Sequence, residues 1–319
     1  MKFIDLFSGI GGFRLALESL GLECVFSSEI DKFAKQTYKA NFGIEPHGDI
    51  TKIDSKDIPN HDILTAGFPC QAFSIAGKRR GFDDTRGTLF FEVARIIRDK
   101  QPKAFILENV PGLVSHEKGS TFQTIIDTLA TTINGQKSFI ETDNLGYHVY
   151  FGYLNSKDFG VAQNRKRIFI VGFRDSINFR FPGATNSNVK LKDILEQNVD
   201  KSLYLSDDEI VKAQFKKSKK SIPRVKNGFE YFFNEGSIQF PNSIEKKSQC
   251  LLAAGQGISR TTTYVDNGNG IRKLSPVECE RLQNVPDNYT DNVSNSQRYK
   301  MLGNGWTVDV IAYIFSQMK

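Results

Sequence analysis

Apolar runs that alternate with helical patterns occupy the first 175 residues of the chain. Five short apolar runs, rich in β-branched and aromatic residues, are typical of strands; they cover Lys2–Phe7, Cys24–Ser28, His61–Gly67, Lys103–Leu107 and Arg167–Phe173. Residues 15–20 and 31–41 show helical spacing between the first three runs. Strands that alternate with helices predict an α/β fold with a mostly parallel, doubly wound sheet covered on both faces.

The pattern changes near Arg174. Residues 176–272 are rich in Asn, Ser, Lys and Gly and show no long helical period, which predicts a smaller, irregular, strand-rich domain. Helical spacing returns from Asp309 to Met318, and we expect this helix to pack back on the first domain. The chain is therefore expected to have a first domain at residues 1–182 completed by residues 293–319, a second domain at residues 183–272 and a connector at residues 273–292.

Composition narrows the class of protein. The chain has 319 residues, of which 39% are hydrophobic and 24% charged, as in ordinary globular proteins. No run approaches the roughly 18 apolar residues of a membrane span, and the apolar run at the N-terminus is too short for a signal peptide. The four cysteines lie far apart without Cys-x-x-Cys spacing, and the four histidines add no metal spacing. We expect a reducing, cytoplasmic location and no metal.

Basic residues outnumber acidic ones, and some of them are clustered. The balance is 42 − 36 = +6, with an isoelectric point near 9.0. From Val211 to Phe229 there are basic residues and no acid; they are Lys212, Lys216, Lys217, Lys219, Lys220, Arg224 and Lys226. Such a run permits contact with a polyanion but is equally compatible with a solvated helix face.

The end of the first strand carries a glycine-rich turn, Phe7-Ser8-Gly9-Ile10-Gly11-Gly12. A dinucleotide fingerprint would need a third glycine where Arg14 stands, so a pyrophosphate cradle is a poor fit. Glu29 follows Gly9 by 20 residues at another strand end, a spacing suited to binding ribose hydroxyls. A nucleoside cofactor without phosphates, such as S-adenosylmethionine, agrees with both observations.

The third apolar run leads into Phe68-Pro69-Cys70-Gln71-Ala72-Phe73-Ser74. A lone cysteine is more often a buried small hydrophobic residue, but Cys70 lies in a strand-to-loop turn, where active-site residues gather. A thiol with a pKa of about 8.5 needs a positive neighbour to ionise at neutral pH. Lys78, Arg79, Arg80 and Arg86 follow closely, between glycines that would let the loop move.

The fourth and fifth runs are flanked by charged residues. Glu108 directly follows Ala104–Leu107, and burial of that run would raise the pKa of its carboxyl group and suit it to carry a proton. Arg165 and Arg167 alternate at the start of the last run, so they point to one face and could hold a carbonyl or a phosphate. Ordinary solvated side chains are the competing interpretation for both groups.

Taken together and in order, these motifs resemble those of the DNA cytosine-5 methyltransferases, in particular the bacterial restriction–modification type. The matching segments are Asp5–Phe13, Gly67–Ser74, Glu108-Asn109-Val110, Gln163–Arg167, Arg272–Pro276 with Glu278 and Arg281-Leu282-Gln283, and Gly303-Asn304. Each motif alone is weak, but the ordered set over nearly the whole chain is specific.

The resemblance implies a mechanism. Cys70 would add as a thiolate to carbon 6 of cytosine, which makes carbon 5 nucleophilic toward the methyl group of S-adenosylmethionine. Glu108 would protonate N3, and Arg167 would donate to O2. Arg165 would be a further catalytic residue. Because the target carbon lies inside the duplex stack, the base must be flipped out.

The resemblance also assigns binding residues. The cofactor residues would be Phe7, Gly9, Gly11, Gly12, Glu29, Ile30, Asp49, Ile50, Pro69, Leu89 and Asn304. The DNA contacts would be Gln71, Ser74, Lys78, Arg79, Arg86, Lys216, Lys217, Lys219, Lys220 and Arg224. The loop from Gly77 to Gly87 would close over the flipped nucleotide, and residues 183–272 would form the target-recognition domain. The partner would be double-stranded DNA, a cognate endonuclease is a further candidate, and we expect a monomer.

Two positions depart from the family pattern. Ile30 stands where several members place an aromatic residue that stacks on adenine. The usual Gly-Asn-Ser/Ala-Val reads Gly303-Asn304-Gly305-Trp306, which contains the only tryptophan of the chain. Trp306 could pack the domain junction or reach the cofactor pocket, and we favour packing.

Three other functions are compatible with parts of the pattern. A tRNA cytosine-5 methyltransferase would share the motifs, although the sizeable segment 183–272 favours DNA. A nicotinamide-dependent oxidoreductase is disfavoured by Arg14 and by the Pro-Cys-Gln turn. A catalytically inactive DNA-binding module is disfavoured by the intact set of Cys70, Glu108, Arg165 and Arg167.

Overall fold

The computed structural model describes residues 1–69, 89–137, 144–218, 223–226, 229–232, 240–253 and 262–318, with only the backbone from residue 214 to residue 232. The chain divides into two compact units. The first unit contains Met1–Asn155, Lys166–Ala184 and Trp306–Lys319, and the second contains Ser156–Arg165 and Thr185–Gly305. Each unit is described by itself below.

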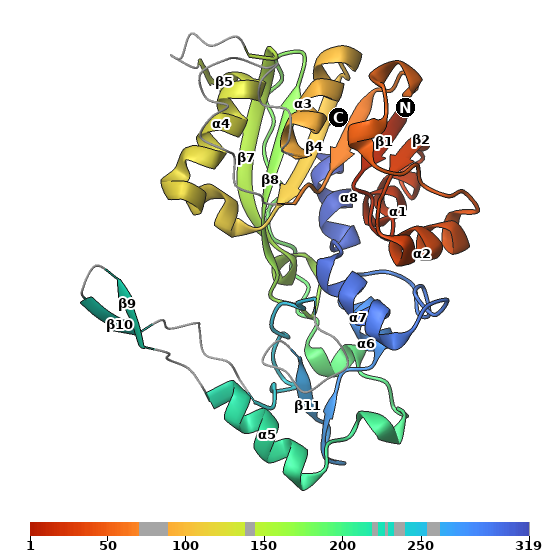
Figure 1. The fold of residues 1–319 in the computed structure, drawn as a ribbon, viewed down its shortest axis with the longest axis vertical. Helices are drawn as coiled ribbons and strands as arrows, with labels where there is room; N and C mark the ends of the chain where they lie inside the picture. Colours follow the sequence, from red (N-terminus) through yellow and green to blue (C-terminus); the bar gives the residue numbers. More distant parts are fainter. Residues whose placement is uncertain are drawn as a thin grey trace. The chain divides into compact units, whose positions relative to one another are not determined.

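An eight-stranded sheet forms the centre of the first unit (Figure 1). Its strands are β1 (Lys2–Leu6), β2 (Glu23–Ser28), β3 (Ile63–Ala66), β4 (Ala104–Asn109), β5 (Ala130–Ile133), β6 (Gln136–Lys137), β7 (Tyr147–Asn155) and β8 (Lys166–Phe173), in the order β2-β1-β3-β4-β8-β7-β5-β6. Strands β2, β1, β3 and β4 are parallel, β8 is antiparallel to its neighbours β4 and β7, and β7 pairs in parallel with β5. The sheet is therefore mostly parallel, as the alternation of strands and helices predicted.

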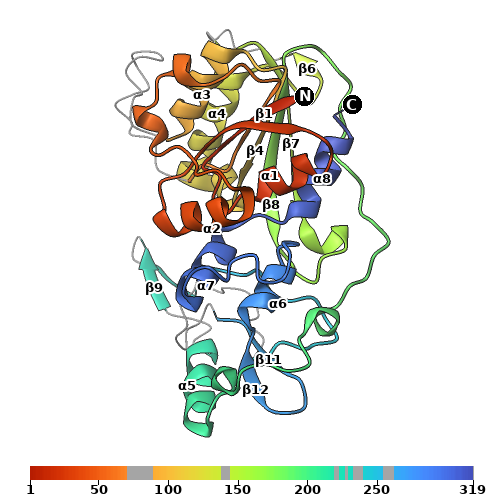
Figure 2. The ribbon, with the colours of Figure 1, turned by 90° about the vertical axis from the view of Figure 1, so that its right-hand side faces the viewer.

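Helices cover both faces of this sheet (Figure 2). They are α1 (Gly12–Glu18), α2 (Lys32–Phe42), α3 (Leu89–Lys100), α4 (Ser120–Leu129) and α8 (Val308–Ser316). Helices α3 and α4 contact each other on one face, and α1 and α8 contact each other on the opposite face. All residues of β3 and β4 are buried between these layers, which explains why their sequences are almost continuously apolar. The predicted α/β class and the C-terminal helix are confirmed.

The second unit has little regular structure. It contains α5 (Asp207–Ser218), α6 (Pro276–Arg281), α7 (Asn295–Asn304) and two small antiparallel sheets formed by β9 (Pro223–Lys226) with β10 (Phe229–Phe232), and by β11 (Tyr264–Asp266) with β12 (Ile271–Lys273). Its irregular character agrees with the prediction, and α5 covers the first part of the Lys-rich run, for which a helix was one of the two interpretations. Short 3-10 helices complete the chain: Ile50–Lys52, Ser55–Asp57, Pro111–Gly119, Ser156–Phe159, Leu191–Ile194 and Lys201–Leu203.

The compact units follow slightly different boundaries from the expected domains. The longer segment of the second unit runs from Thr185 to Gly305 and includes the expected connector at residues 273–292. The second unit also takes in Ser156–Arg165 and residues 293–305, which the sequence pattern places in the first domain. The expected role of residues 183–272 in target recognition stays a prediction.

Candidate active site

The glycine-rich turn and Glu29 meet at the carboxyl ends of β1 and β2. Phe7 and Gly11 have φ angles of 55° and 89°, so the chain turns sharply directly after β1. A side chain at position 11 would collide with the Phe42 ring, because an added Cβ would lie 2.4 Å from it. One carboxylate oxygen of Glu29 accepts the Gly9 N–H at 2.8 Å, and the other accepts the N–H groups of Ile30 and Asp31, each at 2.8 Å.

This corner of the sheet fits a nucleoside ligand. A carboxylate has about four lone-pair positions, and three of those of Glu29 face backbone N–H groups. Ile30 is 71% exposed beside it, so its side chain is available to pack against a base. The hydroxyl oxygens of Ser8 and Ser28 are buried here without a hydrogen-bond partner among the described residues. Buried polar atoms of this kind usually have a partner, such as a ligand or a water molecule.

The other cofactor candidates have different environments. Asp49 caps a 3-10 helix through Thr51, and these hydrogen bonds lower the pKa of its carboxyl group. Ile50 is buried in the apolar core, Pro69 is exposed after β3, and Leu89 begins α3. Asn304 ends α7 in the second unit, whereas the remaining candidates belong to the first unit. Their contacts with a cofactor stay predictions.

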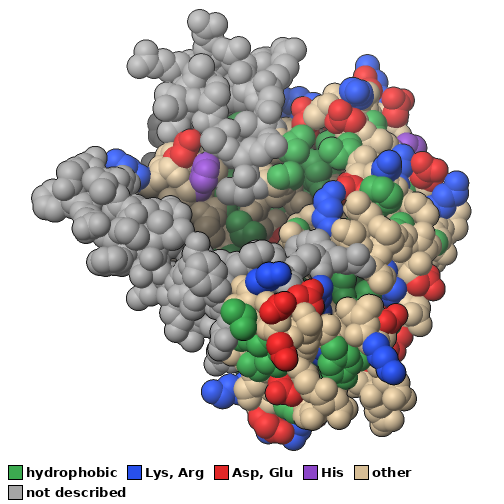
Figure 3. All heavy atoms as spheres, turned by 60° about the horizontal axis from the view of Figure 1, so that its bottom comes forward, with side chains coloured by type: hydrophobic (Ala, Val, Ile, Leu, Met, Phe, Trp, Pro, Cys, Tyr) green, Lys and Arg blue, Asp and Glu red, His purple; other side chains and the backbone are tan. Residues whose placement is uncertain are grey.

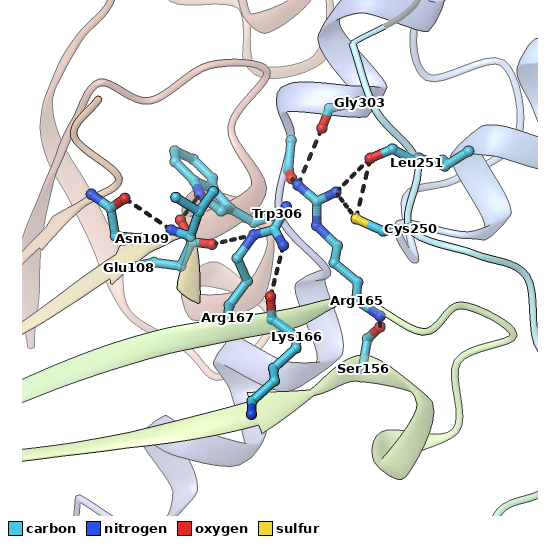
Figure 4. A network of polar contacts seen from close by, with 12 residues as sticks. Glu108, Asn109, Ser156, Arg165, Lys166, Arg167, Cys250, Leu251, Gly303 and Trp306 are labelled. Atoms are coloured by element: carbon cyan, nitrogen blue, oxygen red, sulfur yellow. Dashed lines mark hydrogen bonds and ion pairs between the residues drawn. The ribbon is translucent and has the colours of Figure 1, made fainter. Parts of the chain in front are cut away.

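Glu108 is the centre of a polar group at the carboxyl end of β4 (Figure 4). The residue is 7% exposed, as its position behind an apolar run predicted. The Nε of Arg167, from β8, lies 2.9 Å from one carboxylate oxygen. The indole N–H of Trp306 donates to the other oxygen at 2.8 Å. A carboxyl group and a guanidinium therefore lie together at a strand end of the sheet.

The indole of Trp306 packs within the first unit, and its packing at the domain junction stays a prediction. Its indole lies in the first unit against the glycine-rich turn: an added Cβ would lie 3.4 Å from the ring at Gly12 and 2.1 Å from it at Gly67. The ring also packs against Phe13, with centroids 4.8 Å apart. The small size of the glycines makes room for the indole next to Glu108.

Asn109 connects Glu108 to the strand end that precedes Cys70. The side-chain amide of Asn109 donates to the carbonyl of Phe68 at 2.8 Å, and its oxygen accepts the Val110 N–H at 2.8 Å. This buried contact fixes the backbone two residues before Cys70. Cys70 and the loop residues Gln71, Ser74, Lys78, Arg79 and Arg86 lie outside the described residues.

Arg165 belongs to the second unit and Arg167 to the first. Arg165 is 3% exposed within the second unit. Its guanidinium donates to the backbone carbonyls of Leu251, Gly303 and Gly305 at 3.0, 3.2 and 2.5 Å (Figure 4). Alternation along the strand predicted two equivalent arginines, but Arg165 stabilises the backbone of its own unit. Its contact with a substrate stays a prediction.

Comparison with known proteins identifies the family. The family model for C-5 cytosine-specific DNA methylases matches residues 1–319. This chain belongs to that family. It is 47% identical to the type II methyltransferase M1.ScrFI of Lactococcus lactis subsp. cremoris, over 99% of this chain and 77% of that protein. It is 41% identical to the type II methyltransferase M.HhaI of Haemophilus parahaemolyticus, over 98% of this chain and 93% of that protein.

Solved structures show the same fold. The methyltransferase EhMeth of Entamoeba histolytica superimposes with a TM-score of 0.71 at 19% identity, over 100% of this chain and 99% of that chain. The Dnmt2 methyltransferase of S. pombe gives a TM-score of 0.70 at 18% identity, over 99% of this chain and 97% of that chain. The chain is thus a DNA cytosine-5 methyltransferase with the Rossmann-like methyltransferase fold that the resemblance implied.

Only some of the predicted DNA-contacting residues of this methyltransferase lie among the described residues. Lys216 and Lys217 lie on α5 and Arg224 on β9, but only their backbone is described, and Lys219 and Lys220 lie outside the described residues. The first turn of α5 is acidic, with Asp207, Asp208 and Glu209. On the face shown in Figure 3, acidic and basic side chains of the described residues are interspersed.

Metal-binding groups and membrane-spanning helices are both absent from the described residues. No group of three or more His, Cys, Asp or Glu side chains there could hold a metal ion. No helix in the same part of the chain is long and apolar enough to cross a membrane.

Sequence reasoning missed two residues of the site. Asn109 was part of a quoted motif, but its bond to Phe68 requires β3 and β4 to be neighbours, which the order of runs along the chain does not state. Trp306 stands at a departure from the family pattern. That departure was the available signal, although it did not indicate where the indole points.

Proposed function

We propose that this enzyme transfers a methyl group from S-adenosylmethionine to carbon 5 of a flipped-out cytosine in a specific double-stranded DNA sequence. It would act in the cytoplasm as a monomer and as the methyltransferase of a type II restriction–modification system, in which a cognate endonuclease recognises the same site. The type II relatives at 41% and 47% identity support this assignment.

The observation that carries the proposal is the pairing of Glu108 with Arg167 at a buried strand end. Cytosine needs a proton at N3 and a donor at O2 when a nucleophile adds to carbon 6. The carboxyl group and the guanidinium are 2.9 Å apart, so they can reach neighbouring atoms of one pyrimidine edge. Asn109 ties the strand that leads to the nucleophile to the strand that carries Glu108.

The reaction would proceed by addition to the pyrimidine ring, methyl transfer and elimination. The Cys70 thiolate adds to carbon 6, Glu108 gives a proton to N3, and Arg167 donates to O2, which makes carbon 5 an enamine carbon. S-adenosylmethionine would supply an electrophilic methyl group for that carbon and would leave as S-adenosylhomocysteine when its sulfur–methyl bond breaks. Loss of the carbon 5 proton to a base, expulsion of the Cys70 thiolate and return of the N3 proton to Glu108 then regenerate the enzyme.

The cofactor would be held where the glycine-rich turn meets Glu29. Glu29 would accept from the ribose hydroxyls, with Ile30, Asp49 and Ile50 beside the adenine. Phe7, Gly9, Gly11 and Gly12 would line the turn, and Pro69, Leu89 and Asn304 would close the pocket. The buried hydroxyls of Ser8 and Ser28 support a polar ligand at this corner.

Bisulfite sequencing of duplex DNA after incubation with the enzyme and S-adenosylmethionine tests product and sequence context together. We expect 5-methylcytosine at one short recurring sequence. Cys70→Ala should abolish methylation and keep specific DNA binding, and Cys24→Ala, in a partly buried cysteine of the first unit, serves as a matched control. A methylating Cys70→Ala variant would rule out the nucleophile.

Substrate competition separates the alternatives. Methyl transfer to tRNA but not to duplex DNA would replace our substrate with tRNA. Binding of NADH without binding of S-adenosylmethionine would favour an oxidoreductase, and sequence-specific binding without any methylation would favour an inactive DNA-binding module.

DNA contact by the basic run is tested by salt dependence. We replace four residues by Gln: Lys216, Lys217, Lys219 and Lys220. The slope of log affinity against log salt concentration should become less steep by about 0.9 for each phosphate that the variant no longer neutralises. Gln at Lys190 and Lys192, which pair with Glu245 in the same unit, is the matched control. An unchanged slope would show that these lysines do not contact DNA phosphates and would favour the interpretation of the run as a solvated helix face.

A further inference from the structure

Trp306 lies where the strand ends of the first unit converge. Its indole contacts Gly12 after β1 and Gly67 after β3, and its N–H reaches Glu108 at the end of β4. At Gly67 an added Cβ would lie 2.1, 2.5 and 2.7 Å from three ring atoms, so no larger residue fits beside the indole. The indole is therefore held on several sides in one orientation.

The donor and the acceptor of the hydrogen bond between Trp306 and Glu108 are fixed by their chemistry. An indole N–H can only donate, so the Glu108 oxygen 2.8 Å from it is held as an acceptor. Arg167 approaches the other oxygen at 2.9 Å. When Glu108 is protonated, its proton cannot be on the side of the oxygen that accepts the Trp306 N–H. The hydrogen bond from Trp306 therefore orients the plane of the carboxyl group.

We propose that Trp306 is a positioning residue for methyl transfer, which orients the Glu108 carboxyl group by donating its indole N–H to one oxygen. This inference rests on the proposed function, since it assigns a proton-carrying role to Glu108. In this proposal Trp306 acts on the reaction only through Glu108. The competing explanation is that the indole only fills the space beside Gly12, Gly67 and Phe13.

Trp306→Phe separates the two explanations, because it keeps an aromatic ring against the glycines and removes the N–H. A hydrogen bond to a charged group is worth about 10- to 100-fold in an equilibrium. We expect kcat to fall by about 10- to 100-fold, with KM for DNA and for S-adenosylmethionine changed less than about threefold. A kcat within threefold of wild type, or a loss confined to KM, would overturn the proposal.

A double-mutant cycle tests whether the effect passes through Glu108. In a Glu108→Ala background, where residual turnover is measured in single-turnover experiments, Trp306→Phe should cause no further loss. An additional loss of the same 10- to 100-fold would show that the indole acts independently of Glu108 and would contradict the proposal.

Tryptophan emission gives a readout that needs neither cofactor nor activity. Trp306 is the only tryptophan, so the emission of the full chain reports on this indole alone. Glu108→Gln should change the emission spectrum. Glu92→Gln, in a partly buried ion pair with Arg95 on α3, should leave it unchanged.

Coincident spectra for wild type and Glu108→Gln would overturn the proposal even if Trp306→Phe failed to fold. The same spectra distinguish this inference from the proposed function. If Cys70→Ala still methylates DNA while Glu108→Gln shifts the emission, the proposed mechanism fails and the contact of Trp306 with Glu108 stands.

Discussion

Two buried arginine–glutamate pairs, one in each unit, have opposite characters. In the second unit, Arg272 holds both oxygens of Glu278 at 2.7 and 2.8 Å, and both side chains are 0% exposed. Glu278 also accepts the N–H groups of Glu196 and Ser275, so its roughly four acceptor positions are all used. In the first unit, the Nε of Arg167 lies 2.9 Å from one oxygen of Glu108, and the side chains are 14% and 8% exposed.

The difference separates a structural pair from a pair that can react. A buried pair whose carboxylate has all its acceptor positions occupied leaves no acceptor for a ligand, and breaking the pair leaves a buried charge. The pair of Glu108 and Arg167 keeps partial access to solvent, which the proposed function requires if a pyrimidine is to reach both groups. The two sites carry the same charges, and the exposure of the side chains distinguishes them.

The strongest expected effect is on catalysis at Glu108. Glu108→Gln keeps the shape of the side chain but cannot carry the N3 proton, and kcat should fall by about 10²- to 10⁴-fold. Arg167 keeps its bond to the Lys166 carbonyl at 2.7 Å, so we expect little change in the free energy of unfolding. Single-turnover methylation and urea denaturation measure the two quantities. A large loss of stability would place this pair in the structural class.

The opposite result is expected for Glu278→Gln. Removing one partner of a fully buried ion pair should lower the free energy of unfolding by about 3–5 kcal/mol. Glu245→Gln, in an exposed pair with Lys190 and Lys192, should change it by less than about 1 kcal/mol. Urea denaturation of the three proteins checks this difference. Equal small effects at Glu278 and Glu245 would remove the contrast on which the comparison rests.

The sequence predicted the fold where elements are buried on both faces. Strands β3 and β4 were located within about two residues because their apolar runs are nearly continuous. Strand β7 was missed, since six of its nine residues are partly or fully exposed and its sequence, Tyr147–Asn155, mixes polar and apolar residues. Helix α5 was expected only as one of two interpretations of the Lys-rich run, because its sequence has few apolar residues to set a helical period.

For the site, the sequence supplied residue types but not contacts. Glu108 was correctly expected to be buried, because a carboxylate after an apolar run follows that run into the core. Arg165 and Arg167 seemed equivalent, since alternation along a strand says which face a residue shares but not which groups lie opposite. The contacts of Trp306 come from chain segments nearly 200 residues apart, which no local pattern encodes.

The two arginines provide a smaller, matched contrast. Arg165→Lys leaves at least one of the carbonyls of Leu251, Gly303 and Gly305 without a donor, at a cost of about 1–3 kcal/mol in the free energy of unfolding. Arg167→Lys should instead lower kcat while the urea midpoint stays close to wild type, because this guanidinium is partly exposed. If Arg165→Lys were stable and inactive, Arg165 would be a catalytic residue, as the family resemblance implied.

Asp5, a third buried carboxyl group, gives an effect that is seen only in the pH dependence of stability. Burial in β1 raises the pKa of Asp5 to about 8, and the nearby Glu29 charge adds to this, while the Thr65 hydroxyl at 3.0 Å opposes it. The folded protein therefore keeps the Asp5 proton between about pH 4 and pH 8, whereas the unfolded chain releases it. Stability must fall as the pH rises through this window, by up to about 1.4 kcal/mol per pH unit.

Asp5→Asn should remove this slope, which urea midpoints at pH 5, 6, 7 and 8 would show. Asp62→Asn is the control, because hydrogen bonds from Lys103 and Lys2 lower the pKa of Asp62 and place its contribution at more acidic pH. Parallel curves for wild type and Asp5→Asn would mean that Asp5 is ionised in the folded protein and is stabilised by an interaction like those of Glu278.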